Sequence, residues 1–178
     1  MSEIGKQGQI GPISEQGARN ATEFAKSEVF ARMFHEGMSL VEETAAYLDG
    51  PGRDESRGLS RNAALAYAGE SMRLTTRLMQ VASWLLVQRA LREGEMKPGE
   101  AAAEKYRISV REDAAAASSR CAPELPAALL ALMTRADRLF ERVTEIDAKL
   151  YRGKAEPSGD NEFSRQLEKL KNAFGDAG

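Results

Sequence analysis

The first regular pattern in the chain is a stripe of apolar positions that begins after Ser27. Its members recur at steps of four and three residues, as on one face of an amphipathic helix: Phe30, Phe34, Met38, Val41, Ala45 and Leu48. The stripe is flanked by Met33, Leu40 and Tyr47. Residues 49–52 read Asp-Gly-Pro-Gly, and glycine and proline commonly end helices. The pattern predicts a first helix over residues 27–49, followed by a charged loop of about ten residues.

A second helix is predicted over residues 60–93, between the N-cap residue Ser60 and Gly94. At a rise of about 1.5 Å per residue it extends roughly 50 Å. One apolar stripe on it consists of Leu65, Ala68, Met72, Thr75, Met79, Ala82 and Leu86, and a second consists of Leu74, Leu78, Val81 and Leu85. A polar stripe through Arg73, Thr76, Arg77 and Gln80 is continued by Trp84 and Leu91. The second half is therefore apolar nearly all round, which predicts an additional packing contact from elsewhere in the chain.

The most regular pattern begins near Pro123 or Pro126 and predicts a third helix. Its members step by four and three throughout: Leu125, Leu129, Leu132, Ala136, Leu139, Val143, Ile146 and Leu150. Between the second and third helices, Pro98 can open a short helix through about Arg107, and an irregular connection follows. These elements predict an all-α fold, an elongated three-helix bundle with up-down-up topology.

Both ends of the chain differ from this pattern. Residues 1–22 lack a helical or strand period and are expected to form a flexible N-terminal tail, so the bundle domain is placed at residues 23–152. Residues 153–178 are expected to be a flexible tail with a short amphipathic helix whose apolar face consists of Phe163, Leu167, Leu170 and Phe174. A helix this short is unstable alone, so it is interpreted as a partner-binding peptide on the linker 154–161, or as a fragment that folds back on the bundle.

Composition excludes several classes of partner. The chain has 25 Lys+Arg against 27 Asp+Glu, so it lacks the basic surplus that nucleic-acid binding requires. Its strongest apolar run, residues 81–87, is much shorter than the roughly 20 residues that span a bilayer, so we expect no membrane partner. There is one cysteine, Cys121, and the N-terminus does not resemble a signal peptide, which together favour the cytoplasm.

The residues that carry chemistry in enzymes are scarce. His35 is the only histidine, which excludes a two-histidine zinc site, a di-iron bundle and a serine triad within one chain. His35 lies on the polar face of the first helix and is interpreted as a solvated side chain, and Cys121 as a structural or loop thiol. We therefore expect no catalytic residue, no metal site and no cofactor.

Six residues on the predicted helices are candidates for a dimer or partner surface. Four of them are charged and border the apolar stripes: Glu42, Glu43, Arg73 and Arg77. They fit ion pairs between helices at the edge of the core, or a surface for a partner. Trp84 and Leu91 fit either the core or a self-association interface, and we expect them in the interface of a homodimer.

Two segments resemble a known family. Residues 36–50 read EGMSLVEETAAYLDG, and residues 70–80 read ESMRLTTRLMQ, followed by ASWLL at residues 82–86. These strings, with looser similarity at residues 93–96 and over the third helix, resemble the alphaproteobacterial regulators of CtrA degradation, the RcdA family, over residues 25–152. The resemblance implies a three-helix bundle that pairs as a homodimer and has a flexible C-terminal extension.

The resemblance also implies a function without chemistry. Members of the family are adaptors that link protein substrates, such as the cell-cycle regulator CtrA, and other adaptors to the ClpX unfoldase of the ClpXP protease. The resulting hypothesis is a non-enzymatic adaptor in regulated proteolysis, in the cytoplasm and with the cell pole as a candidate location. The alternative is a structural or apolar-ligand-binding helical bundle with no connection to a protease.

Overall fold

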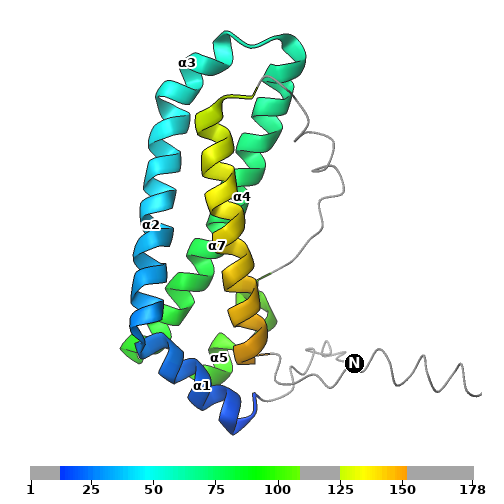
Figure 1. The fold of residues 1–178 in the computed structure, drawn as a ribbon. Coiled ribbons are helices and arrows are strands. Elements are labelled where there is room, and N and C mark those ends of the chain that lie inside the picture. Colours follow the sequence, from blue (N-terminus) through cyan, green and yellow to red (C-terminus); the bar gives the residue numbers. More distant parts are fainter. Residues whose placement is uncertain (1–12, 109–124, 152–178) are drawn as a thin grey trace, which may run out of the picture.

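A computed structural model describes residues 13–108 and 125–151, and every regular element in these two ranges is helical (Figure 1). The elements are α1 (Glu15–Lys26), α2 (Glu28–Asp49), α3 (Pro51–Arg57), α4 (Arg61–Glu93), α5 (Pro98–Ala101), the 3-10 turn η1 (Glu104–Tyr106) and α7 (Ala127–Tyr151). The predicted all-α class is confirmed.

The ends of the two long N-terminal helices lie where the sequence predicts them. The Ser27 side chain accepts a hydrogen bond from the Phe30 amide at the start of α2, and Ser60 does the same for Ala63 at the start of α4. Gly94 ends α4 with a φ of 77°, in the left-handed region that glycine adopts without strain. Local capping chemistry therefore decides these boundaries.

The predicted up-down-up order is wrong. Between α4 and α7 the contacts advance together along both helices, from Arg77 with Asp137 to Trp84 with Asp147, so α7 runs parallel to α4. Figure 1 accordingly shows α4 and α7 beginning at the same end of the bundle. A short loop would force antiparallel neighbours, but the long connection between α4 and α7 returns the chain to the end where α4 starts.

Two short helices replace segments that were expected to be irregular. Residues 15–22, part of the expected N-terminal tail, lie in α1, which packs against α2, α4 and α7. Its buried side consists of Gly17, Ala21 and Ala25, which recur at steps of four. These residues are small and only weakly hydrophobic, so the sequence pattern does not indicate a buried helix face here. The expected charged loop after residue 50 is also wrong, because Pro51 opens α3 and the Tyr47 hydroxyl donates to Glu55 Oε2 at 2.7 Å.

The core of α2 is rotated by one residue from the predicted stripe. Its buried positions are Phe30, Met33, Gly37, Leu40, Thr44 and Tyr47, whereas Phe34, Met38, Val41 and Leu48 are only partly buried. Gly37 lies on the buried side, where the absence of a Cβ lets Leu85 of α4 approach the α2 backbone. On α4 the stripe of Leu74, Leu78, Val81 and Leu85 is buried, and on α7 the predicted seam is buried except at Ile146.

The contact at Gly37 leads to a first prediction. A Cβ added at Gly37 would lie 2.5 Å from Leu85 Cδ1, in a fully buried part of the core. Gly37→Val should therefore lower the free energy of unfolding by about 1 to 3 kcal/mol through overpacking, measured by urea denaturation. The control is Gly99→Ala, where the added methyl meets no atom within 4 Å and stability should stay equal or rise. Equal effects of the two substitutions would contradict the close approach.

Candidate functional site

Among the described residues, several large apolar side chains are exposed along the outward face of α4. The first apolar stripe predicted on this helix is exposed rather than buried, with exposed fractions of 67% at Leu65, 72% at Met72, 65% at Met79 and 51% at Leu86. Soluble proteins expose single apolar residues freely, but an aligned series on one helix is typical of a surface that binds a partner. We call this surface, from Leu65 to Leu86, the outer face of α4.

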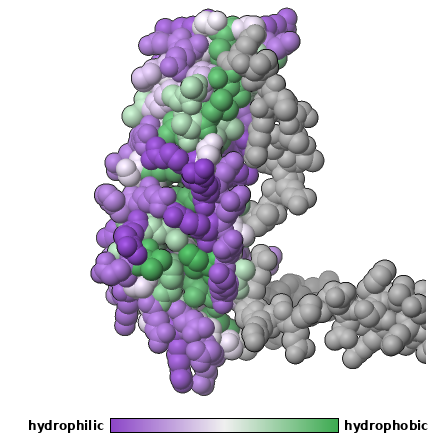
Figure 2. Space-filling view, in the orientation of Figure 1, coloured by the Kyte–Doolittle hydropathy of each residue, from purple (hydrophilic) through white to green (hydrophobic). Residues whose placement is uncertain are grey.

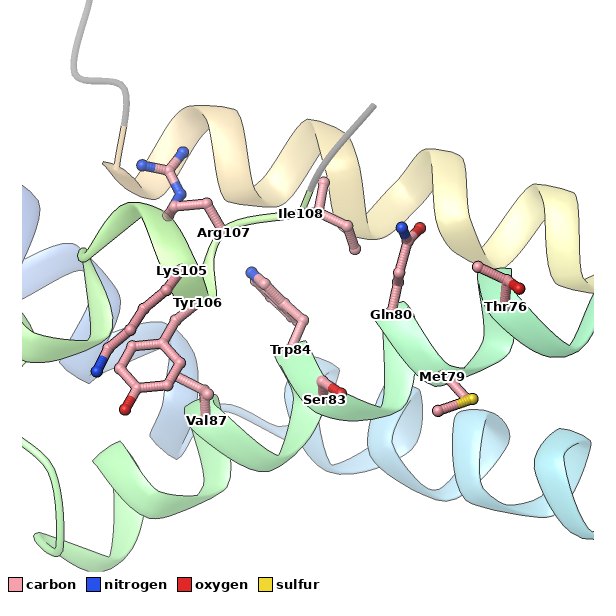
Figure 3. A pocket seen from close by; sticks show the side chains of 10 residues that line it. All are labelled: Thr76, Met79, Gln80, Ser83, Trp84, Val87, Lys105, Tyr106, Arg107 and Ile108. Atoms are coloured by element: carbon pink, nitrogen blue, oxygen red, sulfur yellow. The ribbon is translucent and has the colours of Figure 1, made fainter. Parts of the chain in front are cut away.

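A groove borders the outer face of α4 on each side. The first has a volume of about 500 Å³ and lies between α4 and residues 105–108 (Figure 3). The second has a volume of about 330 Å³ and lies between α2 and α4, lined by Val41, Thr44, Ala45, Leu48, Asp49, Thr75, Leu78, Met79 and Ala82. Met79 lines both grooves. Figure 2 shows hydrophobic patches between hydrophilic rims on the face it presents, so the helices leave part of their apolar surface unburied.

Most of the charged residues considered for a partner surface form ion pairs within the protein. Arg77 pairs with Asp137 of α7 and places its guanidinium 5.0 Å from the centre of the Phe140 ring. Glu43 pairs with Arg135 of α7 at 2.7 Å. The interpretation as ion pairs between helices is confirmed for these two residues. Arg73 pairs with the buried Glu70 of its own helix, and Glu42 is exposed.

Trp84 and Leu91 are buried in the core of the protomer. Trp84 is 1% exposed, and its indole Nε1 donates to Asp147 Oδ1 at 2.9 Å. Leu91 is buried with Ala21 and Ala25 of α1. Both side chains therefore occupy the core, one of the two places that the sequence allowed for them, and the expected second contact on the apolar half of α4 is supplied by α1.

Asp147 is the centre of a buried polar network. Its side chain is fully buried in α7 and accepts hydrogen bonds from Arg107 Nε at 2.7 Å and Arg107 Nη2 at 2.8 Å, in addition to the bond from Trp84. The Arg107 guanidinium also lies 4.9 Å from the centre of the Tyr151 ring. One carboxylate thereby joins α4, α7 and the residues after η1. Periodicity missed it because Asp147 follows the apolar seam residue Ile146 and looked like a solvated position.

Tyr151 extends this network to α4. Its hydroxyl donates to Gln88 Oε1 at 2.9 Å, and Gln88 is fully buried. Burial raises the pKa of the Tyr151 phenol above its ordinary value. The network therefore holds the end of α7 against α4 beside the first groove.

The first groove has an apolar wall, and its charged lining residues are Lys105 and Arg107, of which Arg107 is paired with Asp147. Figure 3 shows the Trp84 indole pointing toward the segment that carries Arg107 and Ile108. Lys105 lies at the same end, with its amine 4.7 Å from the centre of the Tyr106 ring.

His35 is exposed, as predicted. Within residues 13–108 and 125–151, no three His, Cys, Asp or Glu side chains gather in a metal-binding group. No helix in these ranges is both long and apolar enough to cross a membrane. Cys121 and the tail residues Phe163, Leu167, Leu170 and Phe174 lie outside the described residues.

Comparison with known proteins identifies the family. The model of the family described as "Protein of unknown function (DUF1465)" matches residues 21–174. The crystal structure of RcdA from Caulobacter crescentus CB15 is similar, with 59% sequence identity, a TM-score of 0.61, and coverage of 73% of this chain and 97% of that chain. No curated protein matches. Since the family model covers most of the chain and the identity to RcdA extends over nearly the whole of that protein, this protein belongs to the DUF1465 family of RcdA-like proteins.

Proposed function

We propose that the protein is a non-enzymatic adaptor in regulated proteolysis, which presents protein substrates such as CtrA, and other adaptors, to the ClpX unfoldase of ClpXP. The observation that carries the proposal is the 59% identity to RcdA over 97% of that chain. Adaptors of this kind act in the cytoplasm, and we propose the cell pole as the place of action.

The surface of the described residues supports such a role physically. An adaptor must bind a partner without distorting itself, and the grooves beside α4 are held by the packed helices and by the Asp147 network. Both grooves are open, largely apolar, and suited to short peptide segments. The geometry therefore favours binding over chemistry.

We propose that the C-terminal segment docks onto a partner through Phe163, Leu167, Leu170 and Phe174. Four such side chains supply roughly 6 to 12 kcal/mol of gross burial, from which ordering a flexible segment removes about 2 to 5. After association costs, the remainder corresponds to an affinity of about micromolar at best. An adaptor with this affinity can release its client.

Deleting residues 154–178 should reduce CtrA degradation by at least about tenfold in a reconstituted reaction with ClpXP, because the docking contact is lost. The melting temperature should barely change if the segment docks onto a partner and not onto its own bundle. As matched variants, Phe163→Ala with Phe174→Ala should reproduce the loss, whereas Lys169→Ala with Lys171→Ala should not. A large fall in the melting temperature with delivery intact would show that the segment instead folds back on its own bundle.

A second candidate function is binding of an apolar small molecule between α2 and α4. It is favoured by the groove of about 330 Å³, where the buried Thr44 hydroxyl has no hydrogen-bond partner among the described residues. Native mass spectrometry of the purified protein would show a bound molecule as an added mass. A spectrum without added mass would contradict this second function and favour the adaptor function.

A further inference from the structure

A third groove lies between the first turns of α2 and the last turns of α4. Its volume is about 490 Å³, and it is lined by Phe30, Ala31, Phe34, Arg89, Arg92 and Glu93. Its lining residues differ from those of the other two grooves. The groove thus combines aromatic, small and charged side chains of two long helices.

The aromatic part of this groove is the end of a row of rings that begins in the core. The centre of the Phe24 ring lies 6.0 Å from that of Trp84 and 5.8 Å from that of Phe30. The centre of the Phe30 ring lies 5.9 Å from that of Phe34. Trp84 and Phe30 are each 1% exposed, whereas Phe34 is only partly buried. The row of rings therefore reaches the surface at Phe34, where the packed core fixes its position.

The charged lining of the third groove is unbalanced, with two guanidinium groups and one carboxylate. Arg89 takes up the carboxylate: its Nε donates to Glu93 Oε1 at 2.8 Å, and its guanidinium lies 5.5 Å from the centre of the Phe34 ring. Arg92 is exposed and forms no ion pair with residues 13–108 or 125–151. The C-terminal end of α4 stabilises a cation at this position, and the donors of the Arg92 guanidinium remain available to a ligand.

This combination of groups matches one kind of ligand. A guanidinium binds a carboxylate through two parallel hydrogen bonds, which fixes the direction of the ligand as well as its charge. The Phe34 ring and the methylene groups of the two arginines offer an apolar surface beside that carboxylate. A peptide with an acidic residue next to a large apolar residue satisfies both requirements, whereas a basic peptide is repelled.

We propose that the third groove binds a segment of a partner protein in which an acidic residue is adjacent to a large apolar residue. The carboxylate of the segment pairs with Arg92, and its apolar side chain packs on Phe34 and Ala31. The inference rests on the adaptor function proposed above and names the chemistry of one of the partners. It assigns Arg92 and Phe34 as partner-binding residues.

Fluorescence anisotropy tests the groove with a fluorescein-labelled peptide of the sequence Gly-Ser-Asp-Phe-Asp-Leu-Ser-Gly. The full chain should bind this peptide with a dissociation constant below about 1 mM. A peptide with asparagine in place of both aspartates should bind at least about tenfold more weakly, because it loses the charged contact. A peptide with alanine in place of phenylalanine and leucine should lose a similar factor, because it loses the apolar contact.

Substitutions in the protein show where the peptide binds. Arg92→Gln should weaken binding at least about tenfold, and Arg92→Lys should weaken it less, because lysine keeps the charge and loses the paired donors. Ala31→Glu should also weaken binding, because the added carboxylate competes with the aspartates of the peptide. Arg138→Gln, which removes an exposed arginine of α7, is the matched control and should bind within about twofold of the wild type. Circular dichroism verifies that each variant remains helical.

Several outcomes would overturn the proposal. These are equal affinity of the wild type and Arg92→Gln, equal binding of the asparagine peptide, or no binding below about 1 mM. Tighter peptide binding after deletion of residues 154–178 would place the C-terminal segment of this chain in the groove instead of a partner. Dissociation of a dimer when the peptide is added, seen by sedimentation velocity, would assign the groove to a second copy. Peptide binding is measured without a protease, so its failure is distinct from a failure to deliver CtrA to ClpXP.

Discussion

Asp147→Ala should lower the free energy of unfolding by about 3 to 5 kcal/mol, because removing one member of a buried ion pair leaves the other without compensation. The carboxylate is fully buried and accepts bonds from both Arg107 and Trp84. After its removal the Arg107 guanidinium must return to water, and the residues that follow η1 lose their anchor on α7. Urea denaturation measures the loss.

A double-mutant cycle separates the ion pair from simple packing. Arg107→Met alone should also destabilise, since it leaves the Asp147 carboxylate with only the Trp84 bond. The double variant Asp147→Leu with Arg107→Met replaces both charges by apolar groups and should be more stable than either single variant. Additive effects in the cycle would show that the two side chains do not interact.

Trp84→Ala should cost about 3 to 5 kcal/mol of stability in the protomer itself, as truncations of buried aromatic residues do. Trp84 is the only tryptophan, so its fluorescence in wild-type protein reports directly on its buried position. The control is Leu130→Ala, which truncates a half-exposed side chain of α7. Its loss of stability should be much smaller.

Measuring the stability of Trp84→Ala at several protein concentrations distinguishes a packing defect within the protomer from a loss of dimerisation. If Trp84 acts in the core, the destabilisation should persist at concentrations where the wild type is monomeric. Unchanged monomer stability with weakened dimerisation would instead place the indole in an interface, against its hydrogen bond to Asp147. The stability of Trp84→Phe should lie between those of the wild type and Trp84→Ala, because phenylalanine keeps most of the packing and loses the indole donor.

The local sequence determined the features that depend only on residues close together in the chain, such as the ends of helices. The ends of α2 and α4 follow from Ser27, Ser60 and Gly94, because a cap needs only a side-chain oxygen or a glycine next to the first or last turn. The seam of α7 also followed from periodicity, since its large apolar residues occupy one face and small or polar ones occupy the other. The all-α class required nothing more.

The tertiary structure alone decided which of two apolar stripes became the core. On α4 both stripes have helical spacing, but only the one with Leu74, Leu78, Val81 and Leu85 meets another helix, and Met72 and Met79 face outward. On α2 the buried side includes Gly37, which a hydrophobicity pattern does not register and which allows close contact with Leu85. Periodicity measures how apolar a face is, whereas burial depends on what lies opposite.

Long-range partners likewise decided the roles of the candidate residues. The sequence placed Trp84 at the end of a polar stripe, but it could not show that Asp147 and Arg107 would meet it from distant parts of the chain. The parallel course of α4 and α7 had the same origin, because connection length permits either direction and packing selects one. By itself the sequence therefore determined the three long helices and the resemblance to a family, while the tertiary structure determined which faces are buried, because burial is a property of pairs of surfaces.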